Sequence, residues 1–409
     1  MRGFQNRPVW AEVDMGNLAQ NLNSIYPRLE PGTGIMAVVK ADAYGHGAVP
    51  VARFLVKQGV DHLAVAIAAE GIQLREAGIE VPILVLGPSE PAEADELIRY
   101  GLTTSIEHLE MASALQAAAL RLGMTATVHL RVDLTGAGVG LSPESAMGSL
   151  EALRKSDGLR VEGIFTHLIH AYGGASPEAE AEREGFERLV QGLEQAGLTI
   201  PVRHASSSPA ILTLPTAGYQ YVRPGLMLYG LPPLPEKPEI DLQPVMSLKA
   251  RLHAVDPRPA GAQAGYAHRS ATLTEPVRVG TVPIGYADGF YLFFLEKGEV
   301  LVRGRRVPVL GRATMDRLLI DLSAVPEAAP GDEVVLFGQQ GGEQISPVEL
   351  AERAGIGALN TECLTLLSDR VPRYYRYPEE GGEGGAADPK AEPGDPPADP
   401  APAVWIIRA

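Results

Sequence analysis

From about residue 35 to residue 230, short apolar runs alternate with amphipathic stretches of helical period. A strand followed by a helix is the repeating unit of folds built on a parallel sheet. About eight such units within roughly 200 residues favour a TIM-type (β/α)8 barrel over an open sheet. The expected strands are Ile35–Val39, His62–Ala66, Ile83–Leu86, Leu102–Ser105, Ala126–Val132, Gly163–His167, Val202–His204 and Tyr221–Tyr229. The expected helices include Val49–Lys57, Ala92–Arg99, Leu109–Leu122, Pro143–Arg154, Ala179–Ala196 and Pro209–Leu214.

The pattern changes after about Pro235, where strand-like runs are separated by turns rich in Gly, Pro and Asp. Such runs are typical of a compact β-domain. They are Met246–Val255, Val277–Ile284, Glu299–Val302, Arg306–Leu310, Leu318–Leu322 and Glu333–Phe337, with a helical signal at Pro347–Ala354. We therefore expect a barrel over residues 1–240 and a C-terminal β-domain over residues 241–378. An early strand, Val9–Val13, precedes the barrel repeat, and we expect it to lie outside the barrel and to join the β-domain.

Residues 379–409 differ in composition from both domains. Glu379 to Ala403 is rich in Gly, Pro, Ala and Asp and lacks large apolar residues. Such a segment cannot form a packed core, so we expect a disordered acidic tail.

The charge and cysteine content exclude several classes of partner and site. The formal net charge is −15 and there is no long basic run, which argues against nucleic acid and membrane surfaces as partners. A single cysteine, Cys363, excludes an intramolecular disulfide framework and a cysteine-cluster metal site. No apolar stretch approaches the roughly 18 residues of a membrane span. Met1 to Asp14 lacks the pattern of a signal peptide, so we expect a cytoplasmic protein.

Lys40 stands at the end of the first expected barrel strand. The segment from Ala37 to Gly47 is Ala-Val-Val-Lys-Ala-Asp-Ala-Tyr-Gly-His-Gly, an apolar run that delivers one lysine to a glycine-punctuated turn. In β/α barrels the chemistry is carried out at this face. Apolar neighbours lower the pKa of a lysine, which can then act as an amine nucleophile and form a Schiff base with an aldehyde such as pyridoxal phosphate (PLP).

A candidate phosphate site follows the seventh and eighth expected strands, where this barrel usually binds phosphate. After the seventh strand come Ser206, Ser207 and Ser208, whose hydroxyl groups can donate hydrogen bonds. After the eighth, Gly225 and Leu226 can donate backbone N–H groups, and a glycine allows close approach. The serines alone also fit a helix N-cap before Pro209. A phosphate site opposite Lys40 is the layout that PLP requires, so we favour the phosphate interpretation.

Several separate segments, in order, resemble the alanine racemase family over roughly residues 8 to 376. They are Lys40-Ala-Asp-Ala-Tyr-Gly-His-Gly, Phe165-Thr-His, Arg223-Pro-Gly, Leu228-Tyr-Gly, Gly265-Tyr266, Gly285-Tyr-Ala-Asp-Gly, Gly311-Arg-Ala-Thr-Met-Asp and Arg370-Val-Pro-Arg. The resemblance implies an N-terminal PLP barrel followed by a β-domain. It also implies a homodimer in which each active site borrows residues from the partner's β-domain.

The resemblance also implies roles for individual residues. Lys40 holds PLP and serves as the base on one face of the substrate α-carbon, and Tyr266 from the other subunit serves the opposite face. Two bases on opposite faces can invert the carbon, which interconverts L- and D-alanine and supplies D-alanine for peptidoglycan precursors. The cofactor contacts would be Tyr44 and Ser207 at the phosphate, His167 beside the ring and Arg223 at the pyridine nitrogen, with Gly225 and Leu226 at the cradle. Met315 and Asp316 would line the substrate pocket from the partner chain.

The chain departs from the family at four positions. Arg131 stands where the family has a lysine that is often carboxylated and that orients an arginine, and Gly138 stands where that substrate-binding arginine is usual. Arg131 itself is therefore our candidate for the substrate carboxylate. Thr361 replaces a tyrosine that shares the phosphate, and Leu292 replaces an arginine at the site entrance.

Other interpretations of the motifs and of the function were weighed. His167 and His170 are spaced three apart, which on a strand places them on opposite faces, so we expect no metal site. The stretch Gly136–Gly140 is a plain turn rather than a dinucleotide loop, and Asp288 can either shape a turn or take part in chemistry. Two functions remain as alternatives: a racemase of another or broader amino-acid range, such as serine, or a weakly catalytic PLP-binding paralogue. The presence of both Lys40 and Tyr266 argues against the paralogue.

Overall fold

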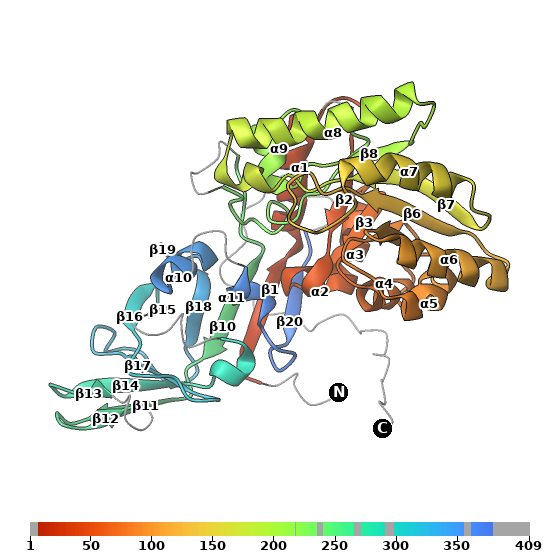
Figure 1. The fold of residues 1–409 in the computed structure, drawn as a ribbon. Helices are drawn as coiled ribbons and strands as arrows, with labels where there is room; N and C mark the ends of the chain where they lie inside the picture. The colour runs from red at the N-terminus through yellow and green to blue at the C-terminus, as the bar shows by residue number, and fades with distance from the viewer. Residues whose placement is uncertain are drawn as a thin grey trace.

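The computed structural model describes residues 7–216, 218–234, 240–265, 271–290, 298–355 and 361–378. The tail from residue 379 onward, Tyr266 and Leu292 lie outside the described residues. The fold has two lobes, a ring of parallel strands surrounded by helices and a β-domain beside it (Figure 1).

The ring confirms the predicted (β/α)8 barrel. Eight strands pair in parallel in the order β8-β7-β6-β5-β4-β3-β2-β9. They are β2 (Gly34–Val38), β3 (His62–Val65), β4 (Ile83–Val85), β5 (Thr103–Ile106), β6 (Ala126–Arg131), β7 (Leu159–Phe165), β8 (Val202–His204) and β9 (Tyr221–Val222). Backbone hydrogen bonds from Gln220 N to Arg203 O and from Arg223 N to Ser206 O close the ring between β8 and β9.

The eighth expected strand, Tyr221–Tyr229, was too long, since only its first two residues pair as β9. Pro224 has no N–H for a ladder, and the residues that follow close turns on themselves. Leu228 N donates to Gly225 O and Tyr229 N donates to Leu226 O. The strand therefore ends where the chain must curl around a cavity.

The helices cover the outside of the ring (Figure 1). Serine side chains cap two of them, with Ser142 accepting from Ser145 N and Ser176 from Ala179 N, and a proline follows each cap at the first helical position. The helices of this lobe are α1 (Met15–Ile25), α3 (Ala48–Lys57), α4 (Ala68–Glu76), α5 (Ala94–Arg99), α6 (Leu109–Leu122), α7 (Pro143–Arg154), α8 (Pro177–Gln195) and α9 (Ser208–Thr213).

The described residues of the β-domain form three sheets. The largest has the order β16-β15-β18-β10-β1-β20 with β19 paired to β18, and the others are β11-β14-β17 and β12-β13. The strands are β1 (Val9–Asp14), β10 (Met246–Arg251), β11 (Ala254–Arg258), β12 (Gln263–Ala264), β13 (Ala271–Thr272), β14 (Val277–Val282), β15 (Glu299–Val302), β16 (Arg305–Pro308), β17 (Leu318–Asp321), β18 (Glu333–Gln340), β19 (Glu343–Ile345) and β20 (Arg373–Arg376). Two helices accompany them, α10 (Pro347–Arg353) and α11 (Glu362–Thr365).

The run Met246–Val255, expected as one strand, is two strands in different sheets. At the break, Leu252 N donates to Asp332 O and His253 N donates to Thr281 O. The backbone therefore changes partner between the β18 side and β14, and β10 and β11 each join their own sheet.

Strand β1 lies in the β-domain sheet, between two strands from the far end of the sequence. It pairs antiparallel with β10 and parallel with β20, so that Ala11 faces both Leu248 and Arg373. Figure 1 shows β1, in red, passing through this sheet before the chain enters the barrel at α1. The chain thus passes from the β-domain into the barrel and then back into the β-domain.

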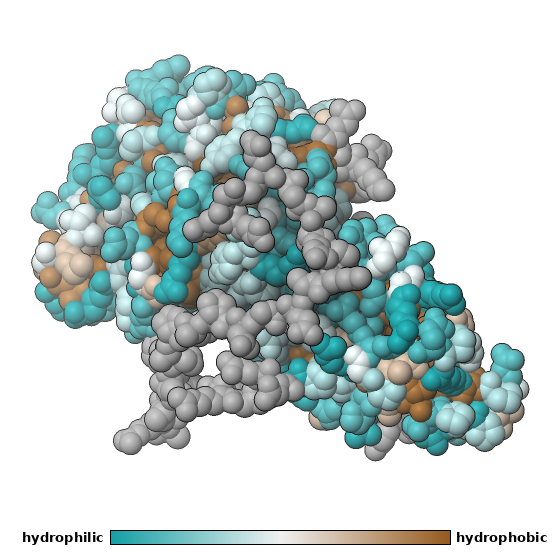
Figure 2. Space-filling model, turned by 180° about the vertical axis from the view of Figure 1, so that it is seen from behind, coloured by the Kyte–Doolittle hydropathy of each residue, from teal (hydrophilic) through white to brown (hydrophobic). Residues whose placement is uncertain are grey.

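The surface seen from behind is mostly hydrophilic, with separate hydrophobic patches (Figure 2). None of the helices in the described ranges is long and apolar enough to cross a membrane.

Candidate active site

A cavity of about 240 Å³ opens where the barrel strands end. Because a cavity of about 150 Å³ already holds a benzene ring, this one has room for an aromatic cofactor ring. Every described residue that lines it comes from the barrel lobe: Val38, Lys40, Tyr44, Ala66, Leu86, Gly87, Arg131, Phe165, His167, Tyr172, Ser207, Ser208, Arg223, Gly225 and Leu226. Nine residues expected at the site therefore lie together: Lys40, Tyr44, Arg131, His167, Ser207, Ser208, Arg223, Gly225 and Leu226.

Lys40 begins α2 (Lys40–Tyr44), a single turn whose backbone is left-handed. Ala41 to Tyr44 have φ angles between +51° and +55°, a conformation that costs a non-glycine residue roughly 1–2 kcal/mol each. Hydrogen bonds from outside the turn hold it: Glu70 Oε1 accepts from Ala41 N at 2.6 Å and Asp42 Oδ1 accepts from Ala48 N at 2.7 Å. The turn brings both Lys40 and Tyr44 to the cavity wall.

The surroundings of Lys40 favour its neutral amine. Burial lowers its pKa, and the cations Arg131 and Arg223 lower it further, whereas the Glu70 carboxylate acts in the opposite direction. A lysine whose ammonium form is destabilised in this way is a better nucleophile and a better base near neutral pH.

A cradle of hydroxyl and backbone N–H groups follows β8 and β9. It lies beside the strand that precedes Lys40 and not opposite it as expected, because β9 pairs directly with β2. Ser208 Oγ accepts from Gly225 N at 3.0 Å and from Met227 N at 3.3 Å, which fixes the loop after β9. At Gly225 a Cβ atom would lie 2.5 Å from Tyr44 Oη, so only glycine leaves the phenol in place. Ser207 stands at the N-cap position of α9, but its side chain makes no cap hydrogen bond, so capping does not explain this hydroxyl.

Arg223 is buried and held by one edge of its guanidinium group. Nη1 donates to His204 Nδ1 at 2.7 Å, and Nη2 donates to the carbonyl oxygens of Thr166 and Ala205. Among the described residues, Nε has no protein partner. Burial lowers the pKa of Arg223 to about 9, which leaves it cationic at neutral pH.

Two histidines continue the hydrogen-bonded chain behind Arg223. Because His204 Nδ1 accepts from Arg223, its proton resides on Nε2, which lies 2.9 Å from His129 Nδ1. Burial lowers the pKa of His204 well below its usual range. Because the pKa of His204 lies far below that of Arg223, the proton and its positive charge stay on the guanidinium group.

His167 and Tyr172 form another part of the wall. Burial and the nearby Arg223 lower the pKa of His167 to about 3, so its imidazole is neutral and offers a flat face. Its ring centroid lies 5.9 Å from that of Tyr172. Ser207 Oγ has no partner of good hydrogen-bond geometry among the described residues, yet it lies close enough to the Tyr172 phenol to lower that group's pKa against the effect of burial.

Arg131 ends β6 and points its guanidinium group at the cavity wall, where Nη1 donates to Glu107 Oε1 at 2.8 Å. Gly138 is not at the cavity. Its N–H donates to Asp133 Oδ2 in an exposed loop that folds around Asp133. Thr361 likewise does not line the cavity, and its carbonyl oxygen caps the start of α11.

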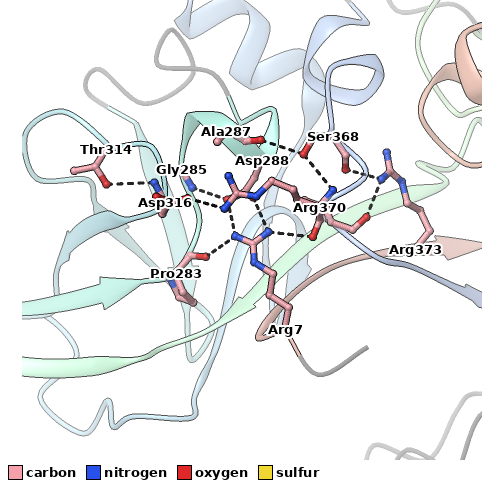
Figure 3. Close-up of polar contacts among 11 residues, drawn as sticks. Arg7, Pro283, Gly285, Ala287, Asp288, Thr314, Asp316, Ser368, Arg370 and Arg373 are labelled. Carbon is pink, nitrogen blue, oxygen red and sulfur yellow. Dashed lines mark hydrogen bonds and ion pairs between the residues drawn. The ribbon is translucent and has the colours of Figure 1, made fainter. Parts of the chain in front are cut away.

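Met315 and Asp316 lie in the β-domain, on an exposed loop that does not line the cavity. Asp316 Oδ1 accepts from Arg370 Nη2 at 2.6 Å, and Arg370 also contacts the buried Asp288 (Figure 3). Asp288 accepts from Gly285 N and binds Arg7. Of the two roles that the sequence left open for Asp288, its described contacts are structural, because they anchor the turn beside Thr314 and Asp316.

Sequence reasoning missed three residues at or behind the cavity: Glu70, Glu107 and Tyr172. The pairing of neighbouring strands is the signal that could have pointed to Glu107. Ile106 pairs with Leu130 across β5 and β6, and the next residues along the two strands are Glu107 and Arg131. Tyr172 and Glu70 follow no regular spacing from Lys40, and only the folded chain brings them to it.

His170 does not share a site with His167. It lies 3.2 Å from the Glu182 carboxylate, outside the cavity. Among the residues that the structure describes, no group of three or more His, Cys, Asp or Glu side chains is arranged to hold a metal ion.

Comparison with protein families gives two matches that together span most of the chain. Residues 13–233 match the alanine racemase N-terminal domain, and residues 245–375 match the alanine racemase C-terminal domain. The alanine racemase of Desulfovibrio desulfuricans is 41% identical over 371 residues, which cover 90% of this chain and 98% of that protein. That of Halothermothrix orenii is 39% identical over 372 residues, which cover 90% and 97%.

Solved structures agree with the sequence matches. An alanine racemase of Clostridium difficile 630 in complex with cycloserine superposes with a TM-score of 0.84 at 35% identity, covering 90% of this chain and 96% of that one. The Bacillus anthracis alanine racemase with bound L-Ala-P has a TM-score of 0.84 at 31% identity, covering 92% and 96%.

Proposed function

This chain belongs to the alanine racemase family, and we propose that it interconverts L- and D-alanine with PLP held on Lys40. The observation that carries the proposal is the position of Lys40. A lysine with a lowered pKa follows the first barrel strand and lines a cavity to which the segments after β8 and β9 bring hydroxyl and N–H groups. This arrangement supplies an amine for the aldehyde and a cradle for the phosphate of one cofactor.

The residues around the cavity fit PLP on chemical grounds. Ser207 Oγ is a buried hydroxyl that lacks a well-aligned partner among the described residues, and Gly225 has no side chain that would displace the Tyr44 phenol. Burial raises the pKa of Tyr44, so its phenol stays protonated and can donate to a phosphate oxygen. Leu226 N would donate to the phosphate beside Gly225. Thr361, which replaces the family's phosphate-binding tyrosine, does not line the cavity, but Tyr172, next to Ser207, supplies another phenol there.

Bound PLP would draw electrons from the substrate α-carbon and so acidify its proton. Arg223 limits this withdrawal: its free Nε–H would donate to the ring nitrogen without transferring a proton, because a guanidinium holds its proton firmly. The neutral His167 would pack against the ring. These residues favour simple removal and return of the α-proton.

Racemisation also needs a proton donor and acceptor on the face of the α-carbon opposite Lys40. In the proposal that group is Tyr266 from the β-domain of a second copy of the chain, and Met315 and Asp316 of that copy border the substrate. The exposed position of the Met315–Asp316 loop supports this homodimer, as does a cavity whose described lining residues all come from the barrel. Arg131 would bind the substrate carboxylate. We place the reaction in the cytoplasm and its product, D-alanine, in the supply of peptidoglycan precursors.

The test uses purified, PLP-loaded protein given L-alanine in D2O, with chiral analysis and counting of α-deuterium. We expect D-alanine that carries deuterium, and we expect Lys40→Ala to lose both this exchange and the absorbance of lysine-bound PLP. Loaded protein that exchanges no alanine proton contradicts the proposal. A panel of other amino acids, serine first, then separates a different substrate range from a PLP-binding paralogue.

A further inference from the structure

Arg131 is held by residues from two neighbouring barrel strands. Its Nη1 donates to Glu107 Oε1 at 2.8 Å, just beyond β5, and to Leu86 O at 3.2 Å, just beyond β4. Glu107 is buried, with 7% of its surface exposed. A charge-assisted hydrogen bond between a buried carboxylate and a guanidinium group is strong and directional, so the pair fixes where the guanidinium group lies.

The two members of the pair differ in their access to the cavity. Arg131 lines it and Glu107 does not. Both described side-chain hydrogen bonds of Arg131 use Nη1, and within the described ranges Nε and Nη2 have no protein partner. A guanidinium group whose third nitrogen is occupied still presents the Nε–Nη2 edge, which matches the two oxygens of a carboxylate.

We propose that Glu107 is a positioning residue that presents the Nε–Nη2 edge of Arg131 to the carboxylate group of the substrate amino acid. The inference rests on the proposed function and assigns a carboxylate receptor that differs from a lone arginine. Glu107 acts from behind the cavity wall and touches neither substrate nor cofactor. Arg131 keeps one permanent anionic partner and takes the substrate as its second.

Two properties of the pair support this role over simple neutralisation of a buried charge. First, a salt bridge that only neutralised Arg131 would not need to leave Nε and Nη2 without a described partner at a cavity that Lys40 also lines. Second, the guanidinium group lies 5.9 Å from the centre of the Phe165 ring, so contacts on two sides restrict its rotation. A receptor fixed before the substrate arrives loses less conformational freedom on binding.

The test measures carboxylate binding directly, by calorimetric titration of the PLP-loaded protein with propionate, which is alanine without its amino group. Glu107→Gln keeps the shape and a hydrogen-bond acceptor but removes the charge. We expect it to weaken propionate binding about tenfold, the size of one lost charge-assisted contact, and to raise KM for alanine with little change in kcat. Glu107→Asp, which keeps the charge, should recover part of the propionate affinity.

Two controls separate positioning from a general loosening of the site. 2-Amino-1-propanol, which has the amino group but no carboxylate, should bind wild-type protein and Glu107→Gln equally. Glu194→Gln breaks a comparable pair with Arg203 on the outer side of the barrel and should leave propionate affinity unchanged.

Unchanged propionate affinity in Glu107→Gln, or an equal loss for propionate and the amino alcohol, overturns the inference. Wild-type protein that takes up PLP but does not bind propionate also overturns it, while cofactor binding stands. Protein that takes up no PLP contradicts the proposed function itself, and this inference with it.

Discussion

Arg7 binds both carboxylate oxygens of Asp288, with Nη1 2.5 Å from Oδ1 and Nη2 2.8 Å from Oδ2. The aspartate is fully buried, and Arg370 contacts it from another side. The same Arg7 also donates to Pro283 O and Arg370 O (Figure 3). A residue just before β1 thus ties together two segments that lie near the other end of the chain.

We expect Asp288→Asn to destabilise the protein by about 3 kcal/mol, because it leaves two arginines without their buried anionic partner. The free energy of unfolding from urea titrations measures this loss. Asp95→Asn, which breaks an exposed pair with Arg121, is the matched control and should change stability little. Equal effects for the two variants would mean that Asp288 has no special anchoring role.

Gly45 ends the left-handed turn after Lys40, with φ of +82°, and a Cβ atom there would lie 2.1 Å from Leu364 O. Gly45→Ala should therefore cost more than the roughly 1 kcal/mol of backbone strain expected at a left-handed glycine position. Gly59→Ala supplies the comparison, since Gly59 has φ of +91° and open space around it. The difference between their unfolding free energies isolates the clash, and no difference would place Leu364 farther away than described.

His46 makes the stability depend on pH. Its ring is buried against Tyr229, and Nδ1 donates to Ala43 O and Tyr44 O. Burial lowers its pKa to about 4, below the unfolded value of about 6.5. Between these values the unfolded chain takes up a proton that the folded chain does not, so this contribution falls as pH falls from 6.5 to 4.

The lowered pKa of His46 contributes about 3 kcal/mol to the free energy of unfolding, and this contribution is lost over that pH window. His46→Asn, which can still donate to the same carbonyl groups, removes it. The stability difference between wild type and variant should therefore shrink as pH falls from 6.5 to 4. A difference that stays constant with pH would show that His46 titrates normally in the folded state.

Tyr172→Phe tests the phenol beside Ser207. If this phenol donates to the cofactor phosphate, its loss should weaken PLP binding by about 1 kcal/mol, the value of one neutral hydrogen bond. Pyridoxal, which has no phosphate, should bind both proteins equally. Affinities from absorbance titration of the apoprotein measure both, and an equal loss for the two ligands would assign Tyr172 to the ring instead.

Subunit mixing tests the shared site. Lys40→Ala and Tyr266→Ala should each be inactive, because each removes one base from every site. After the two variants are unfolded and refolded together, about one quarter of the wild-type activity should return, because half of the randomly formed dimers are mixed and each has one intact site. Mixed protein that stays inactive would mean that both bases come from the same chain.

Residues that follow barrel strands could be predicted from the sequence, because apolar runs mark strand ends and the barrel gathers those ends at one face. Lys40 and Ser207 were found in this way, whereas Arg131 and Arg223 were singled out through the resemblance to the family. The left-handed turn could not be predicted. Ala41, Asp42 and Ala43 have no strong preference for positive φ, and the bonds that hold the turn come from Glu70 and from the residues that follow it.

Contacts between distant segments were also beyond the sequence. The Asp288 motif fitted a turn or chemistry equally well. Only the folded chain shows that its described contacts, with Arg7 above all, are structural. The break between β10 and β11 has a similar cause, since the regular alternation of apolar and polar residues in Met246–Val255 carries no sign that its backbone changes partner.

The position of β1 has a consequence for the order in which the protein can form. In synthesis from the N-terminus, β1 is made first, but its partners β10 and β20 are made after the whole barrel. The barrel strands pair with near neighbours in sequence as they emerge, whereas the β-domain sheet stays incomplete until Arg373–Arg376 have left the ribosome. A nascent chain stalled before that point would carry a finished barrel with β1 as an open edge. An unpaired strand edge can pair with another chain, so such a nascent chain would be prone to aggregate unless a chaperone bound it.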